Sequence, residues 1–227
     1  MGNSRMRAVP YAVAVLGLVI TFAQPAAARP AGQPAGPHLA RWLAIATARS
    51  GLRPDVLRLA LRVHARAVAE HRTRRPLLTV IDFRLLSREK RLWVIDVERG
   101  LVLAHELVAH GRNTGEDRAE RFSNEAGSLQ SSLGTFLTGR SYRGKHGLSL
   151  RLRGLDKIND RAEVRALVVH GADYVNPAIV QQLGRLGRSQ GCPALSRSAA
   201  PRIIRLIQDG TILFAYHPSL RSELAGL

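Results

Sequence analysis

The sequence contains a single cysteine, Cys192, among 227 residues. One cysteine cannot form a disulfide within its own chain, so a disulfide-stabilised scaffold is excluded. Acidic residues are also scarce, because 17 Asp and Glu stand against 34 Lys and Arg, giving a formal net charge of +17. Such a charge permits binding to nucleic acid, anionic lipid or another acidic polymer. Because the arginines are spread along the chain without a block, the charge favours a general surface property over such a partner.

Nucleotide-binding motifs are absent, since the sequence has neither a Gly-Lys-Ser/Thr loop nor a Gly-x-Gly-x-x-Gly fingerprint. Long apolar runs are absent as well, apart from residues 8–23, which follow Arg5 and Arg7 and precede Ala26-Ala27-Ala28. This order of basic, apolar and small residues predicts a signal peptide over residues 1–28. The alternative is an uncleaved anchor, although the run is short for a span of about 20 residues. We therefore expect export to the periplasm or cell envelope, with no stable membrane span after cleavage.

The remainder divides into a helical part and a part rich in strands. Residues 29–37 form a Pro-, Gly- and Ala-rich linker, and apolar residues then recur at helical spacing over 38–50 and 54–71. Further patterns predict strands over 77–83, 92–97, 101–111, 134–137, 148–152, 164–170 and 211–216, and helices over 177–186 and 198–208, the last with Ser198 as N-cap. We predict a mostly β (α+β) domain over residues 77–227, preceded by a linker and helical extension over residues 29–76.

Two short motifs are similar to those of other enzymes but lack what the chemistry requires. His105 and His110 lie five residues apart, whereas a zinc-protease helix needs histidines at i and i+4. On a strand, an odd separation places the two side chains on opposite faces. Residues 87–90 match a Ser-x-x-Lys pattern, but the Lys-Thr-Gly partner of serine penicillin-binding enzymes does not occur. We predict no metal site, and a charged turn at residues 87–90.

The setting of Cys192 favours a reactive thiol. An exported thiol without a disulfide partner is a liability unless it is deeply buried or has a chemical role. Gly191 before it permits a tight turn in which backbone N–H groups converge, as an oxyanion hole requires. His170 follows the apolar run 166–169 and is expected to emerge from a buried strand, with the Gly171 carbonyl holding one imidazole nitrogen.

A histidine beside a cysteine is the minimum equipment for acyl transfer through a thioester. A nearby imidazolium lowers the pKa of a cysteine thiol, so we expect His170 to activate Cys192 as a thiolate. The alternative is a structural cysteine buried near an unrelated histidine.

Three segments together resemble the L,D-transpeptidase (YkuD-type) catalytic domain, in particular its murein L,D-transpeptidase branch. These segments are the strand ending at His110-Gly111, the run Ser132-Leu133-Gly134-Thr135-Phe136, and His170-Gly171 followed by Ser189-Gln190-Gly191-Cys192. The resemblance covers about residues 92–218. It implies a β-sandwich catalytic domain, with the cysteine and the histidine at one mouth of the sandwich.

The resemblance also implies a reaction. Cys192 attacks the carbonyl between the third and fourth residues of a peptidoglycan stem peptide, His170 manages the proton, and D-Ala leaves. An amine of a neighbouring stem then accepts the acyl group, which gives a 3→3 cross-link. The backbone N–H groups of Gln190, Gly191 and Cys192 correspond to the oxyanion hole of the family, and the Gly171 carbonyl orients the histidine. No metal or cofactor is implied, and covalent inhibition by carbapenems is expected.

The chain departs from the family pattern on both sides of the thiol, and the interval of 22 residues from His170 to Cys192 is a few residues longer than usual. Gln190 stands where a second histidine is usual, and Pro193-Ala194 replace an Arg or Asn that commonly follows the cysteine. Replacement substrate contacts are expected from the following residues: Arg188, Ser189, His146 and Tyr174.

Other functions remain open from the sequence. The acyl-enzyme can end at water, which makes the protein an L,D-carboxypeptidase, or the domain can be a cell-wall-binding module with an inactive thiol. Nucleic-acid binding through the positive charge has no recognition motif to support it, and we expect no nucleic-acid partner.

Overall fold

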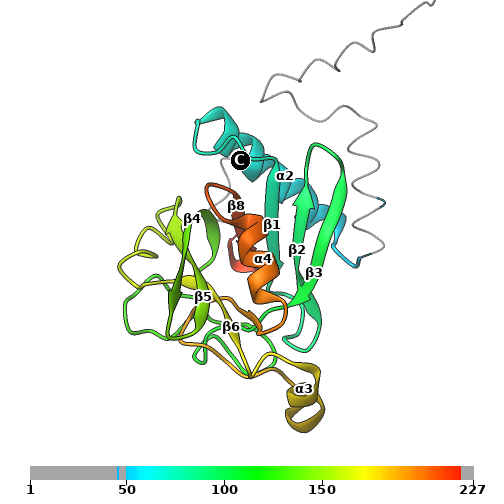
Figure 1. Cartoon of the computed structure of the whole chain (residues 1–227), viewed down its shortest axis with the longest axis vertical. Coiled ribbons are helices and arrows are strands. Elements are labelled where there is room, and N and C mark those ends of the chain that lie inside the picture. The colour runs from blue at the N-terminus through cyan, green and yellow to red at the C-terminus, as the bar shows by residue number, and fades with distance from the viewer. Residues whose placement is uncertain (1–44, 46–49, 221–227) are drawn as a thin grey trace, which may run out of the picture. The chain divides into compact units, whose positions relative to one another are not determined.

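The computed structural model describes Ile45 and residues 50–220. Within these residues eight strands form one sheet, in the order β3-β2-β1-β8-β4-β5-β6-β7. Figure 1 labels all of them except β7. The strands are β1 (Leu77–Asp82), β2 (Lys90–Asp96), β3 (Leu101–Leu107), β4 (Gly134–Gly144), β5 (Gly147–Gly154), β6 (Val168–Ala172), β7 (Ala194–Ser196) and β8 (Ile212–Tyr216). The helices are α2 (Pro54–Ala69), α3 (Pro177–Leu183), α4 (Ala200–Ile207) and the short 3-10 helix η1 (Pro218–Leu220). No helix among the described residues is both long enough and apolar enough to cross a membrane.

The core of the domain lies around two parallel central strands, β1 and β8, in which every residue is buried. Strands covered on both faces are expected to be almost continuously apolar, and these two are. Helix α2 packs against both strands. Its apolar positions recur at helical spacing and belong to the same core as the sheet: Val56, Leu57, Ala60, Val63 and Ala67.

Two isolated bridges nearly close the sheet. β3 and β7 are its edge strands, and the chain after β3 reaches β7 through an antiparallel bridge between Ala109 and Ala194. A parallel bridge then joins Gly111 to Ser189. Residues 108–117 and 188–193, which are far apart in the sequence, therefore lie side by side next to β6.

The predicted mostly β architecture is confirmed, as are helix α2, the β2–β3 hairpin, α3 and the last strand. The strand predicted over 101–111 ends at Leu107, and the helix predicted over 177–186 ends at Leu183. Helix α2 ends at Ala69, and His71 follows with a φ of +56°. The signal peptide predicted over residues 1–28 lies outside the described residues. So does most of the helix predicted over residues 38–50.

Two strand predictions need correction. The strand expected over 164–170 instead runs from Val168 to Ala172, because the residues before it form turns and Ala166 has a φ of +51°. His170 is therefore its central residue rather than its last. Strand β7 was not predicted, since three residues are too few to display a period of two. The strand predicted over 134–137 is the beginning of β4, which continues to Gly144.

The predicted cap of helix α4 is also wrong. The N-cap is Ala199 rather than Ser198, and no side chain caps this end of the helix. The hydroxyl of Ser196 accepts the Ala199 N–H at 3.2 Å and so fixes the entry to the helix.

Candidate active site

His170 is the central residue of β6, between β5 and β7. Its ring is buried, and Nδ1 lies 3.1 Å from the carbonyl oxygen of Gly171, the contact that the sequence led us to expect. A carbonyl only accepts hydrogen bonds, so the proton is on Nδ1 and Nε2 keeps a lone pair. Burial lowers the pKa of His170, as do the nearby His146, Arg197 and Lys145, and the Gly171 contact offsets this in part. The imidazole is therefore neutral at neutral pH.

Cys192 lies two residues before β7. In the parallel pairing of β6 with β7, His170 is opposite Ala194, so the thiol enters the site from the strand next to the histidine. The cysteine is partly buried, and its Sγ is 4.0 Å from the Ala166 carbonyl oxygen in the turn before β6. The pairing of β6 with β7 thus places Cys192 two residues along the chain from the residue opposite His170.

The expected thiolate–imidazolium pair is not what the site contains at rest. Burial raises the pKa of the Cys192 thiol, and the Val168 N–H together with the charges of Arg165 and Lys145 offsets only part of this effect. His170 has a pKa below its ordinary value. Both groups are therefore neutral at neutral pH, the protonation states in which an imidazole can accept a proton from a thiol.

Ser189 organises the turn before the thiol. Its hydroxyl donates to the Cys192 carbonyl at 2.6 Å and accepts the Gly191 N–H at 3.1 Å. Gly191 has a φ of +120°, and a Cβ at this position would lie 2.8 Å from the Gln130 carbonyl oxygen, so the position requires glycine. The Ser131 hydroxyl donates to the Gly191 carbonyl at 3.2 Å, which fixes the turn from a second side.

This turn changes two expectations. The Gly191 N–H, expected to face the substrate carbonyl, is engaged by Ser189 and must leave it to act as an oxyanion donor. Ser189, expected to contact the substrate, is buried and bonded within the turn. Gln190, between them, is exposed.

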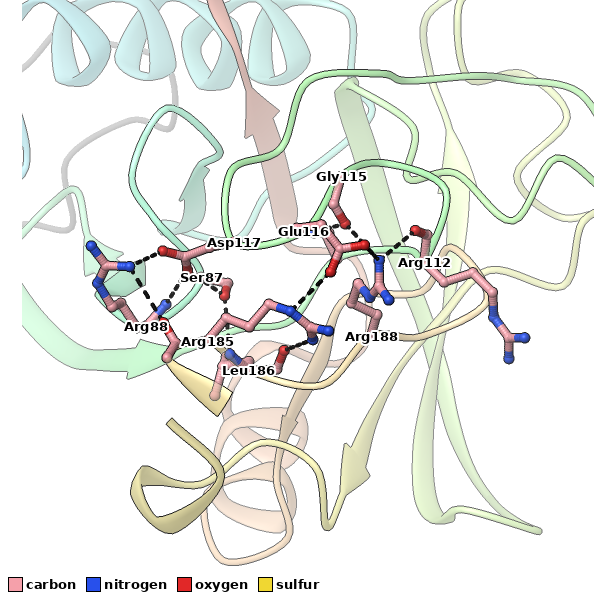
Figure 2. Close-up of polar contacts among 11 residues, drawn as sticks. Ser87, Arg88, Arg112, Gly115, Glu116, Asp117, Arg185, Leu186 and Arg188 are labelled. Carbon is pink, nitrogen blue, oxygen red and sulfur yellow. Dashed lines mark hydrogen bonds and ion pairs between the residues drawn. The ribbon is translucent and has the colours of Figure 1, made fainter. Parts of the chain in front are cut away.

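Arg188, also expected to contact the substrate, instead fixes residues 111–117. Its Nη1 donates to the carbonyl oxygens of Arg112 and Gly115, at 3.1 and 3.2 Å, and to the carboxylate of Glu116 (Figure 2). Arg185 Nε pairs with the same carboxylate at 2.9 Å (Figure 2). The hydrogen bonds of Arg188 thus hold residues 111–117, the segment that borders the thiol turn.

A buried arginine supports that segment from the core. The Arg91 guanidinium donates to the carbonyls of Leu85 and Val108 and to Nδ1 of His110. His110 Nε2 contacts the Gly115 carbonyl at 3.2 Å. Burial, with the charge of Arg91 beside it, lowers the pKa of His110 to about 4. His110 is thus a neutral structural link between Arg91 and the wall of the site.

His105 and His110, whose spacing does not match a zinc-protease helix, lie in different surroundings. His105 lies on β3 and stacks against Trp93, with ring centroids 4.7 Å apart. His110 is buried with Arg91. Among the residues that the structure describes, no three His, Cys, Asp or Glu are grouped so that they could hold a metal ion.

His146 and Tyr174 come to the site from two different loops. His146 is in the β4–β5 turn and stacks on His170. Tyr174 follows β6 and packs over Gly187, where a Cβ would lie 2.4 Å from its own. Burial raises the pKa of Tyr174 to about 12, and the neighbouring Cys192 thiol contributes to this.

Sequence reasoning missed Arg165, which lies in the turn before β6. Its Nη2 approaches Gly191 so closely that a Cβ there would be 3.2 Å away. An arginine five residues before a histidine carries no pattern in a chain with 34 basic residues, so no local signal could have identified it.

Known protein families and solved structures show what this chain is similar to. A family model described as L,D-transpeptidase catalytic domain matches residues 48–216. A search of curated proteins gives no match. Solved structures similar to the chain include an L,D-transpeptidase from Mycobacterium smegmatis, at 16% identity and a TM-score of 0.40, over 63% of this chain and 59% of that one.

Two further structures are similar at the same level. One is LdtMt1 in complex with imipenem, at 17% identity and a TM-score of 0.40, over 62% of this chain and 59% of that one. The other is the helical cell shape determining protein Pgp2 from Campylobacter jejuni, at 14% identity and a TM-score of 0.42, over 62% and 47%. The chain spans about three fifths of the length of the two L,D-transpeptidases.

Proposed function

Because the chain belongs to the L,D-transpeptidase catalytic domain family, we propose that it is an exported, cysteine-dependent peptidoglycan L,D-transpeptidase. Its substrate is a stem tetrapeptide, and its product is a 3→3 cross-link with release of D-Ala. The observation that carries this proposal is the placement of His170. Gly171 fixes its Nδ1, and its strand pairs at Ala194 with the strand that follows Cys192.

The first half-reaction forms the acyl-enzyme. As Cys192 Sγ attacks the carbonyl carbon of the third stem residue, Nε2 of His170 takes the thiol proton, and the carbonyl oxygen becomes an oxyanion. The backbone N–H groups of Gln190 and Cys192 stabilise it, joined by the Gly191 N–H once this leaves Ser189, and each such donor is worth about 2.7–4 kcal/mol. Collapse of the intermediate breaks the C–N bond, and His170 returns the proton to the amine of the departing D-Ala. The product is a thioester on Cys192.

The second half-reaction transfers the acyl group. An amine of a neighbouring stem peptide loses its proton to the neutral His170 as it attacks the thioester. The C–S bond then breaks, and the proton restores the thiol. The neutral His170 of the resting site is the protonation state that both half-reactions need at their start.

Two alternatives use the same site. If water replaces the acceptor amine, the protein is an L,D-carboxypeptidase. If the neutral, partly buried thiol never reacts, the domain is a cell-wall-binding module. Burial raises the pKa of Cys192, and a neutral thiol is a weaker nucleophile than a thiolate. The inactive-thiol alternative is therefore tested together with the others.

The test is product analysis by liquid chromatography and mass spectrometry after the mature protein is incubated with a disaccharide tetrapeptide. Cross-linked dimers that lack one D-Ala support the transpeptidase, tripeptide alone supports the carboxypeptidase, and unchanged substrate contradicts both. Cys192→Ala is the inactive variant. Ser198→Ala, which changes an exposed side chain, is the matched control.

Export is part of the proposal and rests on residues 1–28. We propose that cleavage after Ala28 releases the protein to the periplasm or cell envelope, where its substrate is found. N-terminal sequencing of the protein recovered from cells tests this. A mature chain that begins at Arg29 supports export, and an intact Met1 in the cytoplasmic fraction contradicts it.

A further inference from the structure

Arg165 is held next to the thiol turn by four acceptors from one segment, residues 123–132. Its Nη2 donates to the Gln130 carbonyl at 2.6 Å and to the Ser128 hydroxyl at 3.2 Å. Its Nη1 donates to the Ser123 carbonyl and the Ser132 hydroxyl. The same Nη2 is against Gly191, the residue before Cys192. The side chain is about half-buried, and every partner named here is uncharged.

This arrangement gives Arg165 no carboxylate in direct contact: Glu125 acts on its charge only from a longer distance and is itself paired with Arg161. Arg165 makes no ion pair within residues 50–220, whereas its neighbour Arg161, four residues earlier, pairs with Glu125. An arginine keeps its charge in proteins, and taking an unpaired charge out of water costs free energy. A fold that keeps such a charge beside a thiol provides a place where negative charge can form.

We propose that Arg165 is the counter-cation of the sulfur anion that forms when Cys192 loses its proton, and that it is a positioning residue for the thiol turn. This inference rests on the proposed function, because it takes Cys192 as the nucleophile. When the S–H bond breaks, the proton goes to Nε2 of His170 and the electron pair stays on sulfur. The guanidinium then faces a unit of negative charge, and the attraction between them lowers the free energy of the ionised thiol.

Other charged and titratable groups lie around the thiol and around Arg165. The ion pair of Glu125 with Arg161 lies near Arg165, and its two charges act on the guanidinium in opposite directions. Lys145, in the β4–β5 turn, is a second cation near Cys192 and, like Arg165, lowers the pKa of the thiol. Tyr174 follows β6, and its phenol stays protonated because its pKa is about 12. His170 lies in β6 and is neutral at rest. Lys145 is exposed and is screened by water, so Arg165 is the cation that can act with least screening.

The test is the pH dependence of alkylation of the full chain by iodoacetamide. Cys192 is the only cysteine, so alkylation reports on this thiol alone. Arg165→Gln removes the charge and keeps hydrogen-bond donors, and we expect the alkylation midpoint to rise so that the rate at pH 7 falls about tenfold. Arg165→Lys keeps the charge, and we expect a midpoint close to that of the wild type.

A purely structural role predicts a different pattern. In that case both variants lower the melting temperature, and neither moves the alkylation midpoint of the folded protein. Arg161→Gln, in the same turn but paired with Glu125, is the matched control and should leave the midpoint unchanged. Each protein alkylated in denaturant provides the midpoint of the unfolded chain, which should be the same for all four.

If Arg165→Gln does not fold, Arg165→Met, which also removes the charge, takes its place. A midpoint above the wild-type value supports the inference, and a midpoint at the wild-type value contradicts it. Because alkylation needs no turnover, the result is independent of product analysis. Absence of peptide products together with the expected midpoints would refute the proposed function and leave the electrostatic role of Arg165 standing.

Discussion

The imidazole rings of His146 and His170 are stacked, with centroids 4.4 Å apart and planes inclined by 27°. His146 belongs to the tip of the β4–β5 hairpin, whereas His170 lies inside β6. The proposed base is thus held at two points, by the Gly171 carbonyl on Nδ1 and by a second ring against its face. The hairpin tip therefore takes part in orienting the base.

Removing this ring should slow the reaction without unfolding the domain. We expect His146→Ala to lower kcat/KM roughly 2–10-fold, because an aromatic pair contributes about 0.5–1.5 kcal/mol. His146→Phe keeps a ring for stacking and should retain most of the activity. Initial rates on a tetrapeptide measure the effect. Equal losses in the two variants would show that stacking is not what His146 contributes.

The buried Arg91 should be essential for stability. Arg91→Met leaves the carbonyls of Leu85 and Val108 without their donor, and each unsatisfied buried group costs about 1–3 kcal/mol. We expect the free energy of unfolding in urea to fall by about 2–4 kcal/mol. Arg62→Met, on the exposed face of α2, should change it by less than about 0.5 kcal/mol. Similar values for the two variants would contradict this account of the core.

His110 should make the fold sensitive to acid. Its pKa of about 4 in the folded protein lies below the ordinary value of 6.5, so between these values the unfolded chain binds more protons. The contribution of His110 to the free energy of unfolding is fully present above about pH 6.5. It is lost as the pH falls toward 4, and the loss amounts to up to roughly 3 kcal/mol. His110→Asn retains an acceptor for Arg91 but does not titrate. Its unfolding free energy should fall less than that of the wild type between pH 7.5 and 4.5, and parallel pH curves would contradict the assignment.

Arg188 should act through Glu116 rather than on the substrate. We expect Arg188→Gln and Glu116→Gln to lower kcat/KM by similar, small factors, and the double variant to be no worse than either alone. The Glu116 side chain is 68% exposed, so the stability changes should stay below about 1 kcal/mol. Independent effects that multiply in the double variant would place Arg188 against the substrate instead.

The sequence was sufficient to select Cys192 and His170 as candidates, because each follows a recognisable local pattern. His170 closes an apolar run that forms a buried strand, and the glycine before Cys192 matches a turn whose φ of +120° requires it. Helix α2 and the β2–β3 hairpin also follow from local periodicity. In these places the local preference and the tertiary structure agree.

The contacts around these two residues could not be predicted from local patterns. Arg188 and Glu116 are 72 positions apart, and Arg165 and Gln130 are 35 apart, so their contacts depend on which strands become neighbours. The protonation states were also missed. Pairing cysteine with histidine suggested an ion pair, whereas burial, which residue order does not reveal, disfavours the charged form of both groups.

The central claim is that Cys192 attacks an acyl carbon with His170 as its base, and intact-protein mass spectrometry after exposure to imipenem tests it most directly. We expect the wild type to gain the full mass of one imipenem, mapped to the peptide that contains Cys192. No adduct should form on Cys192→Ser, and adduct formation should be at least about 100-fold slower in His170→Ala. A wild-type protein that stays unmodified, or an adduct that forms equally fast in His170→Ala, would contradict the account.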